Sequence, residues 1–427
     1  MVRSVDERIN ELSFLSNILY LSYDGMTDPL GQSQVLPYLT GLAKRGYKIA
    51  LISFEKPTRF KDHHLHIQSI CKEAGIEWHP LTYTSKPPIL STLKDLFLLW
   101  RKVLKLQQEK TFQIVHCRSY LTALIGLRLK KKFGTRFLFD MRGFWADERI
   151  EGGIWNPKNP IFAFIYRFFK SREKELLKAA DHTIVLTHSA KNIIHGWPNI
   201  SPQQIPITVI PCCVDVEHFD PANVPIDQQQ LIRKKLDISS ETIVISYVGS
   251  LGTWYMLPEM LAFFRVWVQT YPDSVFLCLT GDDPSIFWKE VRTQQLPWEK
   301  VRLKSVSRPK MPTYLSISQY SLFFIRPVFS KKASSPTKQG EIMAMGIPLI
   351  CNTGVGDTDQ IVRDCSAGYL VDSFNDESYA MAVESIRKAP LDKEQIRGGA
   401  IRYFSLSKGV DAYEQVYVNL RNAAATH

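Results

Sequence analysis

The sequence predicts an α/β protein built from two doubly wound, Rossmann-like domains that face a cleft. Short apolar runs recur along the chain and alternate with amphipathic segments, which is typical of buried parallel strands joined by helices. The 427 residues suffice for two domains of roughly 200 residues each. Midway, the proline-bracketed segment Pro211–Pro221 interrupts this rhythm, which then restarts. Because such sheets bind ligands at the carboxyl ends of their strands, we expect one ligand per domain.

The composition indicates an ordinary globular protein, with 45% hydrophobic and 22% charged residues. No apolar run is long enough to predict a membrane-spanning helix, and the first residues lack the apolar core of a secretion signal. The seven cysteines are scattered and show no metal-ligand spacing, which is typical of a reducing compartment. We therefore expect a cytoplasmic protein without a metal or another cofactor.

The net charge of +11 is concentrated in the first half of the chain. Residues 1–213 contain 30 Lys and Arg against 18 Asp and Glu, whereas residues 214–427 contain 23 against 24. This excess is either a solvated basic surface or a face for anionic lipid headgroups or a phosphorylated acceptor. Nucleic acid is not an expected partner, because no recognition motif accompanies the charge.

The first predicted unit is a strand, a loop, a helix and a second strand over residues 17–54. The loop over residues 24–34 is rich in glycine and proline, which disfavour regular structure. It has no GxGxxG motif. We expect Gly31 and Gln32 in this loop to line the cleft, the alternative being an ordinary surface loop.

The rest of the first half continues the alternation. The apolar start of its longest predicted helix, Ile161–Phe169, suits either core packing, which we expect, or a membrane interface. Ser91 is a plausible N-cap of another helix. The predicted helices are Ser91–Gln108, Leu121–Lys132 and Asn159–Ala180, and the predicted strands Phe112–His116, Arg136–Met141, His182–Thr187 and Thr208–Ile210.

The second half begins with a new strand at Thr242–Val248 and ends in two helices, Glu377–Lys388 and Lys408–Arg421. We therefore divide the chain into a first domain at residues 1–211, a second at 212–404, and a C-terminal helix at 405–427 that crosses back toward the first. The strands between them are Val275–Thr280, Val301–Leu303, Ser321–Ile325 and Gly368–Val371.

Ser334–Asp357 is the most informative stretch. It predicts a loop, a short helix headed by Glu341, a cap at Gly346 and a buried strand at Ile347–Cys351. Backbone amides and Lys338 suit a phosphate, while a carboxylate, which only accepts hydrogen bonds, suits both hydroxyls of a ribose. The stretch predicts a site for an anionic ligand with sugar hydroxyls.

The order and spacing of several motifs resemble the family 4 (group 1) glycosyltransferases of GT-B fold, of the bacterial surface-polysaccharide type. The resemblance covers most of the chain. It rests on five segments: Val209-Ile-Pro with Val214-Asp and Phe219-Asp-Pro, then Tyr247-Val-Gly-Ser, Leu279-Thr-Gly-Asp, Gly340-Glu-Ile-Met-Ala-Met-Gly-Ile-Pro-Leu-Ile, and Gly354-Val-Gly-Asp with Gly368-Tyr-Leu-Val.

The resemblance implies that the second domain binds a nucleotide sugar and the first an acceptor. It implies that Glu341 accepts hydrogen bonds from the ribose, that the nucleobase lies near Val306, and that a hexosyl group is transferred with retention and without a metal. The spacing of Asp357 and Asp359 fits a metal motif, but we give this alternative little weight.

Two departures from the family pattern concern the donor. Ala333 stands where the family has a glutamate, and no arginine–lysine pair follows Gly249. We therefore predict that phosphate is bound by amides, hydroxyls and lysines from other positions, with Lys338 also catalytic through stabilisation of the leaving diphosphate. The predicted donor-binding residues are Gly249, Ser250, Gly252, Thr253, Val306, Arg326, Ser335, Thr337, Lys338 and Glu341, with Lys331 and Lys332 as further cations.

A third departure concerns the first domain, where Arg118 and Arg142 stand at two positions often held by histidines. Two arginines suit an anionic group, and we predict that both are catalytic. For the carboxylates, capping or an ion pair with arginine is an equal alternative. The predicted acceptor-binding residues are Gly31, Gln32, His116, Asp140 and Asp147.

The sequence thus predicts transfer of a sugar from a nucleoside diphosphate sugar to a saccharide or lipid-linked saccharide in polysaccharide biosynthesis. We expect a cytoplasmic enzyme that is peripheral at the inner face of an anionic membrane. Two alternatives remain: a catalytically silent nucleotide-sugar-binding subunit, and a nucleotide-sugar 2-epimerase.

Overall fold

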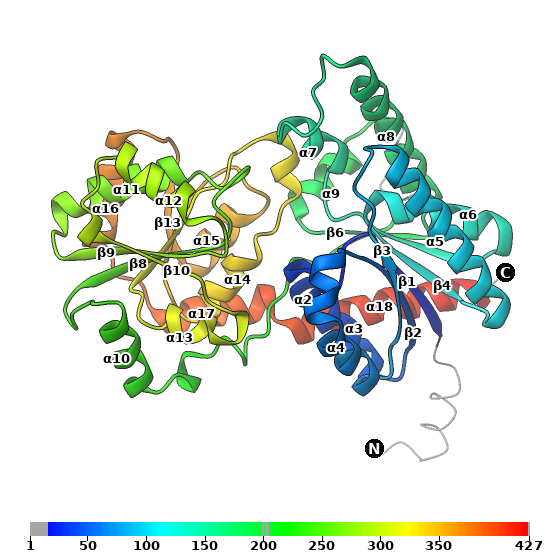
Figure 1. Ribbon diagram of the computed structural model, residues 1–427, viewed down its shortest axis with the longest axis horizontal. Coiled ribbons are helices and arrows are strands. Elements are labelled where there is room, and N and C mark those ends of the chain that lie inside the picture. The colour runs from blue at the N-terminus through cyan, green and yellow to red at the C-terminus, as the bar shows by residue number, and fades with distance from the viewer. Residues whose placement is uncertain (1–15, 199, 201–204, 426–427) are drawn as a thin grey trace. The chain divides into compact units, whose positions relative to one another are not determined.

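The computed structural model describes residues 16–198, 200 and 205–425, and it divides the chain into two compact units (Figure 1). The first unit comprises the described residues up to Ile150, Trp155–Ile210 and the chain from Leu406 onward; the second comprises Glu151–Ile154 and Pro211–Ser405. Each unit has its own parallel sheet with helices on both faces. The N-terminal residues on which we based the absence of a secretion signal lie outside the described residues.

The sheet of the first unit has seven parallel strands in the order β3-β2-β1-β4-β5-β6-β7. The order reverses between β1 and β4, so this is the point at which such a sheet binds ligands. The strands are β1 (Asn17–Ser22), β2 (Lys48–Glu55), β3 (Glu77–Thr82), β4 (Ile114–Arg118), β5 (Arg136–Asp140), β6 (His182–Val185) and β7 (Ile207–Val209).

Strand order decides which face each helix covers, because parallel crossovers are right-handed. The connections from β1 to β3 run one way across the sheet, and those from β3 through β4 to β7 run the other way. Helices α5, α6 and α8 therefore share one face, on which α6 packs against both of the others; α3, α4 and α18 lie on the opposite face. The bounds are α2 (Pro29–Gln34), α3 (Leu36–Lys44), α4 (Pro57–Glu73), α5 (Leu90–Glu109), α6 (Ser119–Phe133), α7 (Trp145–Glu151), α8 (Pro160–Ala179), α9 (His188–His195) and α18 (Leu406–Ala425).

The sheet of the second unit has six parallel strands in the order β10-β9-β8-β11-β12-β13. Its strands are β8 (Ile243–Val248), β9 (Ser274–Leu279), β10 (Val301–Lys304), β11 (Tyr320–Phe323), β12 (Leu349–Asn352) and β13 (Gly368–Val371). Its α-helices are α10 (Ile226–Lys235), α11 (Leu257–Thr270), α12 (Pro284–Thr293), α13 (Met311–Leu315), α14 (Thr337–Ala344), α15 (Thr358–Cys365), α16 (Asp376–Lys388) and α17 (Lys393–Phe404). Short 3-10 turns include η3 (Arg308–Lys310) and η4 (Phe329–Ala333).

The predicted fold class is confirmed: both units are doubly wound α/β structures. The sequence reading nevertheless missed several helices, among them α4, α9, α15 and α17, and the edge strand β3. These elements carry many charged or polar residues and contain no long apolar run. The residues around the predicted N-cap Ser91 also differ, because α5 begins at Leu90 and has no side-chain cap.

Two local predictions were wrong. The loop at residues 24–34 contains a helix, α2, whose proline stands at the first helical position, where no amide donor is needed. The helix of the Ser334–Asp357 stretch begins at Thr337, before Glu341, and thereby includes Lys338 in its first turn.

The apolar start of α8 does not pack in the core as we expected. Ile161 and Phe164 are 58% and 69% exposed, and Phe169 is the one residue of Ile161–Phe169 that is buried. Helix α8 is one of the described helices, none of which is long and apolar enough to cross a membrane.

Candidate functional sites

The second unit encloses Lys338 in a box of aromatic rings at the carboxyl end of β8. The Lys338 Nζ lies 3.6 Å from the ring centroid of Tyr255 and 4.3 Å from that of Tyr247. It also donates a hydrogen bond of 3.3 Å to the Tyr247 hydroxyl. Lys338 is 7% exposed, and no ion pair holds it among the described residues. The cation is therefore retained by ring faces, not by a carboxylate.

Burial lowers the pKa of Lys338 to about 7, and the charge of Glu341 only partly opposes the shift. A charged amine in a desolvated box lacks the water that stabilises it elsewhere. An anion placed against Nζ would restore the charged form. The box is thus suited to a phosphate, and it leaves Lys338 poised between two protonation states near neutral pH.

The loop after β8 is shaped around this amine. Gly249 has φ of +135°, and a Cβ at that position would lie 2.5 Å from Lys338 Nζ. The loop is held by Leu251 N, which donates to Asp282 Oδ2 at 2.6 Å, and by the Tyr247 hydroxyl, which donates to the carbonyl of Ser250. Of the predicted donor-binding residues here, Ser250, Gly252 and Thr253 are exposed and accessible to a ligand.

Glu341 lies one turn beyond Lys338 on α14 and is 6% exposed. Its Oε1 is 2.7 Å from the Nη1 of Arg308, an ion pair whose geometry is not that of an aligned hydrogen bond. The guanidinium of Arg308 also lies over the ring of Phe219, 5.6 Å from its centroid. We did not predict Arg308; its place directly after Ser305-Val-Ser, past the end of β10, was the available signal.

Other predicted donor-binding residues lie in different settings. Ser335 Oγ accepts a hydrogen bond of 3.1 Å from the amide of Cys212, so this hydroxyl ties η4 and α14 to the linker. Thr337 is half-buried at the start of α14, and Val306 packs against the hydrophobic core of the unit. Their contact with a donor stays a prediction.

Three further cations follow β11. Lys331 is 6% exposed, and its Nζ lies 3.7 Å from the ring centroid of Trp254. Lys332 Nζ lies near Gly354, 3.8 Å from where a Cβ of that residue would stand. Arg326 is exposed, and its amide donates to the carbonyl of Trp254 at 2.9 Å. Two buried lysines thus stack on aromatic rings of the same loop, Trp254 for one and Tyr255 for the other.

In the first unit, Arg118 and Arg142 converge on a buried carboxylate, Asp140. Residues Arg118 and Asp140 are paired in register at the carboxyl ends of β4 and β5. The Asp140 Oδ2 lies 3.9 Å from Arg118 Nη1, and its Oδ1 lies 3.7 Å from Arg142 Nη1. Arg118 also binds Asp24 through Nε at 3.1 Å. The predicted pair of arginines is therefore brought together at the strand-order reversal.

The charged groups of this cluster are paired mainly with one another. Burial favours the neutral form of Asp140, but the charge of Arg142, a hydrogen bond from His116 and the charge of Arg118 together lower its pKa. Burial lowers the pKa of His116, which is therefore a neutral imidazole. The carboxylates of Asp140 and Asp24 balance the two guanidinium groups, but Arg118 Nη1 is buried without an aligned hydrogen-bond partner among the described residues and can donate to an anion.

Tyrosines of the last helix engage the predicted acceptor-binding residues His116 and Asp140. His116 Nδ1 is 2.8 Å from the hydroxyl of Tyr417, and Tyr413 donates to Asp140 Oδ2 at 3.2 Å. Since His116 and Asp140 are 1% and 0% exposed, both position the arginines. We did not predict a role for these two tyrosines, although their spacing of four residues on α18 predicts a common helix face.

The other predicted acceptor-binding residues are also engaged locally. A Cβ at Gly31 would lie 2.2 Å from the carbonyl oxygen of Gly25, so close backbone packing requires glycine there. Gln32 donates to the carbonyl of Thr27 at 3.1 Å. Asp147 accepts hydrogen bonds of 2.8 Å from both Tyr166 and Lys170. Acceptor contacts by these three residues stay predictions.

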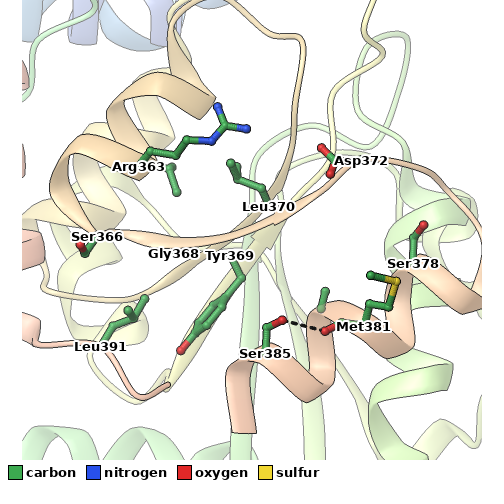
Figure 2. A pocket seen from close by; sticks show the side chains of 12 residues that line it. Arg363, Ser366, Gly368, Tyr369, Leu370, Asp372, Ser378, Met381, Ser385 and Leu391 are labelled. Carbon is green, nitrogen blue, oxygen red and sulfur yellow. Dashed lines mark hydrogen bonds between the residues drawn. The ribbon is translucent and has the colours of Figure 1, made fainter. Parts of the chain in front are cut away.

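A separate hollow lies at the edge of the second sheet, among α15, β13 and α16 (Figure 2). Its volume is about 520 Å³, and Arg363, Tyr369, Asp372 and Met381 are among its lining residues. None of the predicted site residues lines it. Its place on the edge strand, away from the strand-order reversal at β8, separates it from the aromatic box.

Two family models match the chain in succession. The one described as Glycosyltransferase Family 4 matches residues 33–218, and the one described as Glycosyl transferases group 1 matches residues 228–401. Together they cover most of both units. The chain therefore belongs to the family 4, group 1 glycosyltransferases of GT-B fold, and its class of activity is transfer of a sugar.

Individual relatives are distant. A D-inositol 3-phosphate glycosyltransferase of Thermomonospora curvata is 20% identical over 325 residues, which cover 73% of this chain and 72% of that protein. A glycosyltransferase structure from Rickettsia africae has a TM-score of 0.70 at 18% identity, covering 95% of this chain and 98% of that one. The Anabaena protein HepE, in complex with UDP and glucose, has a TM-score of 0.67 at 12% identity, covering 94% and 99%. These structures share the fold.

Proposed function

We propose that this protein transfers a hexosyl group from a nucleoside diphosphate sugar to a saccharide or lipid-linked saccharide, with retention and without a metal or cofactor. The observation that carries the proposal is Lys338, a buried amine without an internal carboxylate partner, held beside Gly249 at the end of β8. Breaking the glycosidic bond leaves a diphosphate, and stabilising that leaving group is the main catalytic need. UDP bound to HepE makes a uridine diphosphate donor a reasonable first choice.

In this proposal the cations of the second unit take the role that a metal ion has elsewhere. Lys338 binds a diphosphate oxygen, and Lys331, Lys332 and Arg326 supply further positive charge for the other oxygens. Glu341 accepts hydrogen bonds from the ribose, exchanging the side chain of Arg308 for the two hydroxyls. The departing phosphate takes the acceptor proton, so front-face attack requires no separate base.

Arg118 and Arg142 serve the acceptor in this proposal. Guanidinium groups at the ends of β4 and β5 suit a phosphate or diphosphate group on the acceptor, as in a lipid-linked saccharide of surface polysaccharide synthesis. The expected place is the cytoplasm, peripheral at the inner face of the membrane. The seven cysteines are buried and outside any disulfide, which accords with a reducing compartment.

The test of the donor site is binding and turnover with a panel of nucleoside diphosphates and their sugars. A true donor at about 100 times its Kd should stabilise the protein by about 2.7 kcal/mol in a thermal melt. Glu341→Ala should weaken nucleotide binding, whereas Arg308→Ala should leave it intact or strengthen it because the carboxylate is then unpaired. The proposal fails if no nucleotide shifts the melt.

Product analysis tests the finer statements. Nuclear magnetic resonance of the first-formed product gives its anomeric configuration, and an inverted product would contradict retention. Activity that survives chelation by EDTA is expected, and activity restored only by added Mg²⁺ or Mn²⁺ would contradict metal independence.

A second candidate function is a nucleotide-sugar-binding subunit without activity. It is favoured by Ala333, which is 2% exposed in η4 and brings no carboxylate to the site. Nucleotide-sugar binding with neither transfer nor hydrolysis, across lipid-linked and free saccharide acceptors, would select this alternative.

A further inference from the structure

Helix α5 exposes a stripe of large apolar side chains at its beginning. Leu90, Leu93 and Phe97 are 64%, 57% and 59% exposed. Their spacing places them on one face of the helix. The opposite face is anchored by Asp95, which is buried and accepts hydrogen bonds from Tyr23 at 2.8 Å and from the hydroxyl of Thr84 at 2.7 Å. The apolar stripe is therefore held outward by a fixed polar contact.

Helix α8 carries the same pattern. Ile161, Phe164 and Phe168 are 58%, 69% and 37% exposed, with the same spacing as in α5. Packing against the core does not account for this apolar segment, because Phe169 is the one residue of Ile161–Phe169 that is buried. Exposed aromatic rings in consecutive turns are unfavourable in water and typical of a surface that meets an apolar partner.

The two stripes lie on the same side of the first sheet. Helices α5 and α8 both pack against α6, on the face opposite to α4 and α18. Because a crossover helix runs antiparallel to its strands, the beginnings of both helices point toward the carboxyl edge of the sheet. That is the edge on which Arg118 and Arg142 stand.

Cations surround the apolar stripes. Arg101 lies over the ring of Phe97, 5.9 Å from its centroid, and Arg172 lies over Phe168 at 5.2 Å. Lys94 and Lys105 on α5 and Arg167 on α8 are exposed. From Leu90 to Gln108, α5 exposes no carboxylate, because its one acidic residue there, Asp95, is buried. Apolar stripes bordered by cations are complementary to anionic lipid headgroups over acyl chains.

We propose that these exposed residues of α5 and α8, the two-helix surface, dock the protein on an anionic membrane. The inference rests on the proposed function, and it specifies how a lipid-linked acceptor is presented. The apolar side chains enter the interface while the cations contact phosphate groups. The carboxyl edge of the first sheet then faces the membrane, so the head of an acceptor whose lipid stays in the bilayer reaches Arg118 and Arg142.

Flotation of the full-length protein with lipid vesicles tests the surface. Binding to phosphatidylcholine vesicles that contain phosphatidylglycerol is expected at low salt, with weak binding to phosphatidylcholine alone. The double variant Phe97→Glu/Phe164→Glu should bind at least about tenfold more weakly. Leu65→Glu is the matched control, since Leu65 is 70% exposed on α4, on the opposite face of the same sheet. No binding by the wild type, or an equal loss in the control, would overturn the proposal.

Two measurements keep the result interpretable. Circular dichroism and the melting temperature show whether the double variant folds; if it does not, Phe164→Ser and Leu93→Ser replace it. Light scattering of the wild type and the variant tests a second copy as the occupant: a dimer that the substitutions dissociate, without vesicle binding, would overturn the proposal. Binding of UDP and GDP, measured without vesicles, should be unchanged by the variant. Vesicle binding by a protein that binds neither nucleotide would support the surface while the donor site fails.

Discussion

The two units surround their buried basic side chains in different ways. In the first unit, Arg118 and Arg142 share the carboxylate of Asp140, and tyrosines of α18 complete the network. In the second unit, Lys338 has ring faces and a hydroxyl but no carboxylate partner among the described residues. The arginine cluster is therefore electrostatically satisfied before any ligand arrives. The lysine box needs an anion, and it should change its protonation state when one binds.

The largest expected effect concerns the satisfied cluster. Asp140→Asn removes the shared buried charge and leaves two guanidinium groups facing each other, which should cost about 3 kcal/mol of unfolding free energy. The pKa of Asp140 is lowered in the folded protein, so its contribution is present above the pKa of an unfolded aspartate and is lost as pH falls through the folded value.

Urea denaturation at neutral and acidic pH checks this prediction. Asp411→Asn is the control, because Asp411 is 61% exposed in its pair with Arg45 and should contribute less than about 1 kcal/mol. An equal loss in both variants would mean that Asp140 has no special role in holding the arginines.

The lysine box should respond in turnover more than in stability. Lys338→Met retains the length of the side chain and removes its charge, so it should lower kcat by about 100-fold while the protein still folds. Steady-state kinetics with saturating donor measures the change. Lys289→Met, on the surface of α12, is a suitable control. Unchanged kcat in Lys338→Met would separate this amine from the chemistry.

Titration distinguishes the units further. The pKa of Lys338 is about 7 in the folded protein, against 10.5 for a lysine exposed to water. Between these values the unfolded chain holds the additional proton, so this residue makes the ligand-free protein more stable as pH rises through that window. Binding of a diphosphate should take up a proton, and its affinity should fall by up to about tenfold per pH unit above 7.

Calorimetry of UDP binding in buffers of different ionisation enthalpy measures both the affinity and the proton uptake. Lys338→Arg should remove this pH dependence, because a guanidinium stays charged throughout the window. Affinity that does not vary with pH in the wild type would contradict a neutral lysine in the box.

The smallest expected effect is at the edge of the arginine cluster. Tyr417→Phe removes the hydroxyl that contacts His116 Nδ1 and should cost about 1 kcal/mol. The melting temperature measures it, and Tyr314→Phe in the second unit provides a comparison with a half-buried tyrosine. A loss near 3 kcal/mol would show that α18 controls the whole cluster.

Much of the fold was predictable because buried strands and helices appear in the sequence as apolar runs. The strands β1, β8 and β13 were placed within a residue or two of their observed bounds. The amphipathic, charged elements α4 and α15 were missed because their apolar residues are few. Gly340 belongs to a family segment that the sequence shows, but the sequence does not show why glycine is needed there. In the structure, a Cβ at this position would lie 3.0 Å from Phe404 and 3.1 Å from Val214.

The cationic residues of the candidate sites were predictable from the sequence, but the side chains that contact them were not. Lys338, Arg118 and Arg142 stood out as cations at strand ends or in a motif. The rings of Tyr247 and Tyr255 that surround Lys338 were not predicted as its partners, since a tyrosine in an apolar run has no pattern of its own. Asp140 and His116 read as ligands of an acceptor because burial is not visible along the chain.

By itself, the sequence determined the alternation of strands and helices, the midpoint boundary, the uneven charge and the family. These follow from local periodicity, composition and motif spacing. Tertiary structure alone decided which groups are desolvated and which face outward. It placed Lys338 between aromatic rings, buried Asp140 between arginines, and left Phe97 and Phe164 exposed, because solvent exclusion depends on packing between elements far apart in the chain.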